Sequence, residues 1–187
     1  MTDFHVPFGK TDLTMPKLVF GATTLGNLFV APSDETKREL VRSWFDQVGA
    51  PVAIDTAGKY GAGLSLEVIA RELDAADVDP ANVIISNKLA WRRVTLKGPE
   101  PTFEPGAWID LQHDAVQDIS YDGIMRCYED GKRILGKYTQ QLISVHDPDE
   151  YLAAAGDAAD RNKRINDIIE AYRALAELRD SGEALVL

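Results

Sequence analysis

Residues 52–67 constrain the fold of this 187-residue chain more than any other stretch, because a strand pattern changes there into a helix pattern. An apolar, partly β-branched run ends at Asp55, and glycines at positions 58, 61 and 63 then break the chain. Ser65 is placed to cap an amphipathic helix that carries Leu66, Ile69 and Leu73. The stretch therefore predicts a strand, an exposed turn and a helix, with Asp55 at the carboxyl end of the strand.

The alternation of strand and helix patterns continues along the chain. Further strands are predicted at residues 18–21, 83–86, 141–146 and 184–187. Further helices are predicted at residues 34–48, 121–135 and 165–178, with Ser33 and Ser120 as N-caps of the first two. Such alternation implies a parallel sheet with right-handed crossovers. About four βα units and the start of a fifth strand match the first half of a (β/α)8 TIM barrel, so we expect residues 1–187 to form a single α/β domain of this incomplete type.

Two segments fall outside this alternation. Residues 1–17 contain prolines and a glycine, and they predict a short hairpin or an irregular lead-in. Residues 90–119 are rich in proline and glycine and contain Trp91, Phe103 and Trp108. Because unstructured connections of this length are uncommon in compact domains, we expect a lid, a binding loop or a disordered insertion here.

The charge balance narrows the class of partner. The chain carries 20 basic and 30 acidic residues, a net charge of −10, without a run of Lys or Arg. Such a surface disfavours nucleic acid and anionic membranes, so we expect a small-molecule partner. The acidic cluster Asp147, Asp149 and Glu150 is expected to be solvated surface. A single cysteine, Cys127, and the lack of a membrane-span pattern favour a cytoplasmic location. The three histidines have no metal-ligand spacing, so no catalytic metal is expected.

Polar, titratable side chains stand where the predicted strands end. Asp55, Lys88 and His146 each lie at or just past the carboxyl end of a strand, and Tyr60 lies in the loop after Asp55. Loops at that edge of an α/β fold converge on one crevice, so we expect the four side chains to meet. Taken singly, each has a structural explanation, such as turn capping, solvation or partial burial. Together, a tyrosine hydroxyl assisted by an ammonium suits proton exchange at a carbonyl or hemiacetal oxygen, while a nicotinamide exchanges hydride.

Four motifs give the sequence a resemblance to a known family. They are Leu-Val-Phe-Gly at residues 18–21, Asp-Thr-Ala with Tyr-Gly within residues 55–61, Ser-Asn-Lys-Leu at residues 86–89, and Ser-Val-His-Asp-Pro-Asp-Glu at residues 144–150. On these motifs the chain resembles the N-terminal half of an aldo-keto reductase over essentially all of its length. The motifs Lys-Tyr-Gly-Ala-Gly and His-Asp-Pro-Asp are most similar to those of the bacterial sugar 1-dehydrogenase and pyridoxal 4-dehydrogenase branch of the family. Enzymes of that branch oxidise cyclic hemiacetals to lactones.

The resemblance implies a catalytic tetrad of Asp55, Tyr60, Lys88 and His146 at the carboxyl mouth of a (β/α)8 barrel. Tyr60 would be the general acid or base, and Lys88 would assist its ionisation. Asp55 would support Lys88, while His146 would orient the reacting oxygen. The chain would then be an NAD(P)-dependent oxidoreductase acting on a small carbonyl compound or sugar.

The resemblance also implies how a nicotinamide cofactor, NAD or NADP, would meet the chain. Thr23, Thr24 and Leu25 would lie near the nicotinamide ribose or the substrate, together with Asp55. Because the resemblance covers the first half of a barrel, a homodimer that closes a barrel is one expectation for the assembly.

Two other functions stay open at this point. The chain could be a non-catalytic remnant that keeps the tetrad and acts as an oligomerising or binding scaffold. It could also be a metal-independent lyase or aldolase that uses Lys88 as a Schiff-base amine at a barrel mouth.

Overall fold

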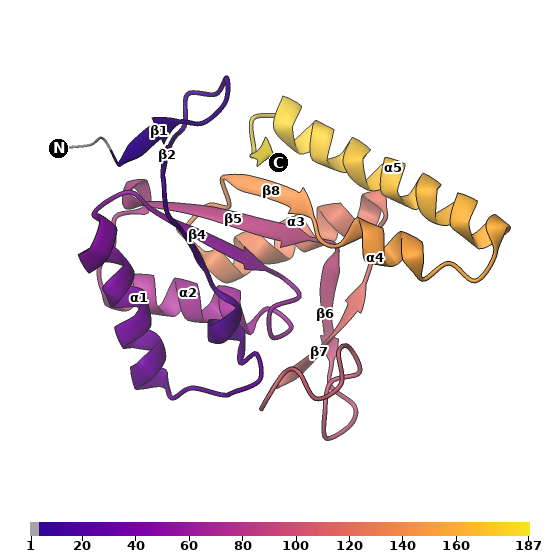
Figure 1. Cartoon of the computed structure of the whole chain (residues 1–187), viewed down its shortest axis with the longest axis horizontal. Coiled ribbons are helices and arrows are strands. Elements are labelled where there is room, and N and C mark those ends of the chain that lie inside the picture. The colour runs from indigo at the N-terminus through magenta and orange to yellow at the C-terminus, as the bar shows by residue number, and fades with distance from the viewer. Residues whose placement is uncertain (1–3) are drawn as a thin grey trace.

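The computed structural model describes residues 4–187, and its centre is a five-stranded parallel sheet (Figure 1). In spatial order the strands are β3 (Val19–Gly21), β4 (Val52–Ala57), β5 (Val83–Leu89), β8 (Leu142–Val145) and β9 (Leu185–Val186). Each strand pairs in parallel with the next one along this order. The sheet confirms the α/β architecture that the alternating pattern predicts.

Helices pack against one face of this sheet in two groups. The helices are α1 (Asp34–Val48), α2 (Leu64–Ala75), α3 (Tyr121–Leu135), α4 (Pro148–Ala153) and α5 (Ala158–Asp180), with short 3-10 turns η1 (Thr23–Gly26) and η2 (Pro80–Asn82). A buried apolar cluster joins α1 and α2 to Val52 and Ile54 of β4, and a second joins α3 and α5 to Ile143 and Val145 of β8. Figure 1 shows α1 beside α2, and α5 running along the β8 side of the sheet.

The predicted capping residues explain where two of these helices start. The hydroxyl of Ser33 accepts a hydrogen bond from the Thr36 backbone N–H, and that of Ser120 accepts one from Gly123. Helix α1 spans the predicted residues and is followed by Gly49.

The opposite face of the sheet is apolar at the amino ends of the strands and polar at their carboxyl ends. Ala53, Ile84 and Leu142 form a small buried cluster there with Met15. Met15 belongs to an antiparallel hairpin of β1 (His5–Pro7) and β2 (Thr14–Pro16), which confirms the predicted short hairpin within residues 4–17. Residues 1–3 of the predicted lead-in lie outside the described residues. Because side chains alternate along a strand, this face continues towards the carboxyl ends as Asp55, Lys88 and His146.

The long segment after β5 folds into a hairpin of its own. Strand β6 (Trp91–Thr95) pairs antiparallel with β7 (His113–Gln117), and Figure 1 shows this hairpin projecting from the end of β5. The chain between the two strands packs against the loop after β4, where Phe103 and Trp108 are buried in a cluster with Ala62. The segment is therefore an ordered hairpin whose loop lies over the strand ends.

Helix α2 starts differently from the prediction. Its N-cap is Gly63, with φ 87°, and the helix begins at Leu64 rather than after Ser65. Glycine adopts this left-handed conformation without strain. The helix therefore begins directly after Gly63 and does not use Ser65 as its cap. The hydroxyl of Ser65 is fully buried instead, where it donates to the Ala22 carbonyl at 2.8 Å and lies 3.0 Å from the Thr56 hydroxyl. Ser65 thus ties α2 to the loop after β3.

Within residues 4–187, no helix combines the length and apolar character needed to cross a bilayer.

Candidate active site

Asp55 and Lys88 form the base of a polar site at the carboxyl edge of the sheet. Strand β4 pairs with β5 so that Asp55 is level with Ser86 and Ala57 is level with Lys88. The Lys88 ammonium donates to the Asp55 carboxylate, and the side chains are 21% and 35% exposed respectively. The structure thus brings these two predicted residues into direct contact.

Tyr60 is held beside Lys88 by the loop that follows β4. Its backbone N–H donates to the Ala57 carbonyl at 3.1 Å, and its own carbonyl accepts from the Ser65 N–H at 3.2 Å. The Lys88 Nζ lies 5.0 Å from the centroid of the Tyr60 ring, within the range of a cation–π contact. The ring is therefore fixed between its own loop and the Lys88 ammonium.

Close backbone packing sets the position of that loop. A Cβ added to Gly26 would lie 2.7 Å from the backbone carbonyl carbon of Tyr60, so the η1 turn passes very near the loop. Gly61 on the other side has φ 63°, a conformation that favours glycine. Because Gly26 has no side chain, the loop after β3 packs directly against the loop after β4.

His146 completes the group from the end of β8. Its backbone N–H donates to the Leu89 carbonyl at 3.0 Å, and its ring meets the Tyr60 ring edge to face, with centroids 5.6 Å apart at 85°. Burial lowers the pKa of His146 to about 4, with the nearby Lys59 and Lys88 cations acting in the same direction. Its imidazole is therefore neutral near physiological pH. The Nδ1 atom is buried and has no hydrogen-bond partner among the described residues.

An open pocket of about 400 Å³ is lined by Tyr60 and His146, whereas Asp55 and Lys88 are not part of its lining. The side chains that line it are Thr23, Leu28, Phe29, Lys59, Tyr60, Glu104, Pro105, Ala107, Trp108 and His146. Trp108 reaches it from the β6–β7 hairpin and stacks on Tyr60, with ring centroids 6.1 Å apart. The volume is within the range of small-molecule sites, and the lining is mostly apolar with a few polar groups.

The three residues predicted from the loop after β3 take different positions. Thr23 lines the pocket, and Thr24 is exposed. The side chain of Leu25 is fully buried in the apolar cluster with α1 and α2, so it does not line the pocket.

Lys59 is a pocket residue that the sequence analysis missed. Its side chain is 6% exposed, and its ammonium lies 2.8 Å from Glu104 Oε1, 3.0 Å from Asp147 Oδ2 and 3.8 Å from Glu150 Oε2. Asp147 and Glu150 are therefore not merely solvated surface, because both face a buried cation beside the pocket. The sequence did contain a signal for this contact: a lysine precedes Tyr60, and an aspartate follows His146. Both pairs lie in loops that meet at one edge of the sheet.

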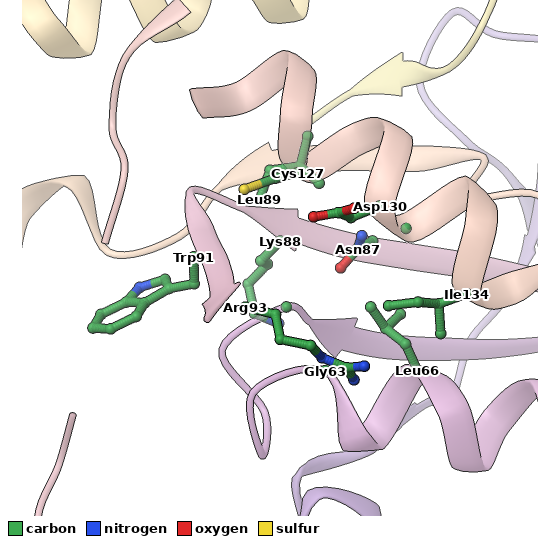
Figure 2. Close-up of a pocket in the computed structure, with 12 residues that line it drawn as sticks. Gly63, Leu66, Asn87, Lys88, Leu89, Trp91, Arg93, Cys127, Asp130 and Ile134 are labelled. Atoms are coloured by element: carbon green, nitrogen blue, oxygen red, sulfur yellow. The ribbon is translucent and has the colours of Figure 1, made fainter. Parts of the chain in front are cut away.

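A second cavity lies between β5, α2 and α3 (Figure 2), and it is too small for a substrate. Its volume of about 20 Å³ has room for roughly one water molecule. Asn87 faces it from β5, and Asp130 and Ile134 face it from α3. Cys127 also lines it, and burial raises the pKa of this thiol to about 12, which leaves it unreactive.

Across residues 4–187, no group of three or more His, Cys, Asp and Glu side chains is arranged to hold a metal ion.

Comparisons with solved structures relate this arrangement to known folds. The glycerol dehydrogenase of Gluconobacter oxydans superposes with a TM-score of 0.63 at 19% identity, over 98% of this chain and 47% of that one. An aldo-keto reductase of Bacillus halodurans gives a TM-score of 0.62 at 20% identity, over 96% of this chain and 47% of that one. The parallel sheet and its helices are therefore a partial (β/α)8 barrel.

Sequence comparisons identify the family. Pyridoxal 4-dehydrogenase of Microbacterium luteolum is 29% identical over 185 residues, which cover 93% of this chain and 51% of that enzyme. The chain thus spans about half the length of the curated relative it matches. The model of the aldo/keto reductase family matches residues 17–186. Because this match covers nearly all of the sequence, the chain belongs to the aldo/keto reductase family.

Proposed function

We propose that this protein is an NAD(P)-dependent oxidoreductase that transfers hydride between a nicotinamide and a carbonyl or cyclic hemiacetal carbon. The observation that carries the proposal is a chain of contacts in which the Asp55–Lys88 ion pair lies against the Tyr60 ring and Tyr60 contacts His146, with Tyr60 and His146 lining the pocket. Membership in the aldo/keto reductase family supports the same reaction type.

Tyr60 is the general acid or base in this proposal. In the oxidising direction its oxygen takes the proton of the substrate hydroxyl, and in the reducing direction it returns that proton to the carbonyl oxygen. The Lys88 ammonium near the Tyr60 ring stabilises negative charge on the tyrosine oxygen, and Asp55 holds Lys88 in place through their ion pair. His146 lines the same pocket as a neutral imidazole, which suits a group that orients the reacting oxygen by hydrogen bonding.

The pocket fits the nicotinamide end of the cofactor better than its diphosphate. Its open, mostly apolar lining has room for a planar ring, and Thr23 supplies a hydroxyl at its edge. Among the described residues that line it, the permanent cation is Lys59, which three carboxylates already surround. A bound nicotinamide supplies the hydride acceptor or donor. Thr23 and Asp55 are the residues of this chain that we assign to the cofactor side of the site.

The lining also suggests the class of substrate. Trp108 and the exposed Phe29 offer flat apolar surfaces beside Tyr60. A cyclic hemiacetal, either an aldose ring or the hemiacetal form of pyridoxal, presents an apolar ring face and a hydroxyl at the reacting carbon. The similarity to a pyridoxal 4-dehydrogenase supports oxidation of such a ring to a lactone.

The Schiff-base alternative is disfavoured by the contact that Lys88 makes. A Schiff-base lysine needs a nitrogen that is free to attack a carbonyl, and the Asp55 carboxylate holds the Lys88 nitrogen in an ion pair.

The proposal is tested first by titrating the chain with NADH and then with NADPH, following the fluorescence of the reduced nicotinamide. Saturable binding of one or both supports the proposal and identifies the preferred dinucleotide. Oxidation of pyridoxal and of a panel of aldoses is then followed through formation of the reduced cofactor. A chain that binds neither dinucleotide favours a non-catalytic scaffold instead.

A further inference from the structure

Lys59 connects three separate parts of the chain at the edge of the pocket. It precedes Tyr60 in the loop after β4, and its ammonium contacts Glu104 from the β6–β7 hairpin and Asp147 from the loop after β8. It also lies over the Trp91 ring, 5.0 Å from the centroid. With a side chain only 6% exposed, Lys59 is a buried cation that these groups hold in one position.

Asp147 is shared between Lys59 and His146. The same oxygen, Asp147 Oδ2, lies 3.0 Å from Lys59 Nζ and 3.3 Å from His146 Nε2. Asp147 has a left-handed backbone, with φ 49°, which directs the chain from His146 into α4. The contact between Nε2 and Asp147 is a charge contact and not a hydrogen bond, so the carboxylate favours a proton on Nε2 and leaves that proton available to donate to a reacting oxygen.

We propose that Lys59 is a positioning residue for His146: by binding Asp147 Oδ2, it holds that carboxylate against Nε2 and fixes the orientation and tautomer of the imidazole. The proposal rests on the proposed function in that His146 is taken to orient the reacting oxygen. Lys59 acts through Asp147 and makes no contact with the reacting atoms in this scheme.

The charges around His146 indicate what the Lys59–Asp147 contact prevents. Two carboxylates, Asp147 and Asp55, favour the protonated imidazole. Two cations, Lys59 and Lys88, oppose it. Asp55 and Lys88 are paired with each other, and the Tyr60 ring covers another side. Without Lys59, the Asp147 carboxylate would be free to draw a proton onto His146 and convert it into an imidazolium.

Lys59 has a second role that the test must separate from the first. Glu104 Oε1 contacts Lys59, while Glu104 Oε2 accepts a hydrogen bond from Trp108 Nε1 at 2.6 Å. Loss of Lys59 therefore also loosens the hairpin loop. Glu104→Gln removes this charge and leaves Asp147 untouched, so it is the matched control for loosening of the loop.

The experiment is an NMR titration of histidine labelled with 15N and 13C in the whole chain, which reports the tautomer and protonation of each ring. The His146 signal is assigned by its loss in His146→Gln. In the unsubstituted chain we expect a neutral ring with the proton on Nε2 down to about pH 5. In Lys59→Met we expect the pKa of His146 to rise by at least about one unit, because a neighbouring unpaired carboxylate stabilises the imidazolium.

The control variants have distinct expected results. Lys59→Arg restores the low pKa of His146 because the guanidinium also binds Asp147. Lys132→Met removes a lysine of α3 that pairs with Glu183, and it leaves the His146 signals unchanged. Glu104→Gln does not raise the pKa of His146, which separates the hairpin contact from the effect of Asp147.

Two outcomes would overturn the proposal. One is an unchanged pKa and tautomer of His146 in folded Lys59→Met. The other is a rise of the same size in Glu104→Gln, which would assign the effect to the hairpin. If Lys59→Met does not fold, Asp147→Asn provides the test, because loss of the carboxylate should reduce the preference for a proton on Nε2. None of these readouts needs cofactor or substrate, so a failure of the proposed hydride transfer is distinguishable from a failure of this inference.

Discussion

Asp55 and Lys88 form an ion pair across two adjacent parallel strands although they are not level with each other. Asp55 pairs with Ser86, so Lys88 lies two residues closer to the carboxyl edge, and its side chain reaches back to the carboxylate. This offset leaves the ammonium beneath the Tyr60 ring.

Tyr60→Phe should reduce turnover by at least about 100-fold, because it removes the proton-transferring hydroxyl and keeps the ring. The Trp108 stacking and the Lys88 contact involve the ring, so thermal unfolding should be unchanged. Steady-state rates and calorimetry check both parts. Full activity in this variant would contradict the proposed mechanism, while a chain that is inactive with and without the substitution favours the scaffold alternative.

Asp55→Asn should lower the turnover rate on the order of 100-fold, because Lys88 loses the group that fixes its position. Since Asp55 acts through Lys88, the double variant with Lys88→Met should be no slower than Lys88→Met alone. A double-mutant cycle on kcat measures this coupling. Additive losses would mean that Asp55 acts independently of Lys88.

Lys88 should form no Schiff base with carbonyl substrates, because the Asp55 carboxylate binds its side-chain nitrogen and keeps it from attacking a carbonyl. Incubation with pyridoxal or an aldose, followed by borohydride reduction and peptide mass spectrometry, checks this expectation. Pyridoxal also reacts with surface lysines, so the comparison is the extent of labelling at Lys88 against that at the exposed Lys132. Preferential, stoichiometric trapping on Lys88 would support a lyase or aldolase instead.

Gly26→Ala should destabilise the fold by about 1–3 kcal/mol, because its new Cβ overlaps the backbone of Tyr60 and both loops must shift. It should also lower activity, since the shift displaces the Tyr60 hydroxyl. Gly21→Ala is the matched control, because a Cβ at Gly21 meets no atom within 4 Å. Denaturant unfolding and kinetics on the two variants test the prediction, and equal effects would refute it.

His146 should make the protein less stable as the pH falls from about 6.5 to about 4. The pKa of the folded state is lowered from its ordinary value of 6.5 to about 4, so the unfolded chain binds a proton in this range that the folded protein does not. The corresponding loss reaches about 3 kcal/mol at the low end.

Urea unfolding at several pH values measures this slope. In His146→Gln the slope should be shallower by that contribution, whereas His113→Gln, which alters β7, should retain it. The same pH dependence in the unsubstituted chain and in His146→Gln would show that other groups cause it.

The sequence by itself determined the order of the five parallel strands and of α1, α2, α3 and α5, and the edge of the sheet at which the four titratable side chains gather. Apolar runs, the caps Ser33 and Ser120 and the glycine after α1 are local signals, so they predict elements without knowledge of the remaining chain. The ends of the predicted strands likewise place Asp55, Lys88 and His146 at one edge, because loops at the carboxyl edge of an α/β fold converge.

The tertiary structure alone decided which charges meet around that edge. Lys59 and Asp147 are 88 positions apart in the sequence, and their contact exists only because two loops converge beside β5. Ser65 resembles a helix cap locally, yet long-range hydrogen bonding to Ala22 draws it into the core. The contact between Trp108 and Tyr60 likewise joins two distant segments, the hairpin after β5 and the loop after β4. Local patterns determine the elements, whereas the partners of a buried charge or hydroxyl depend on which distant segments exclude water around it.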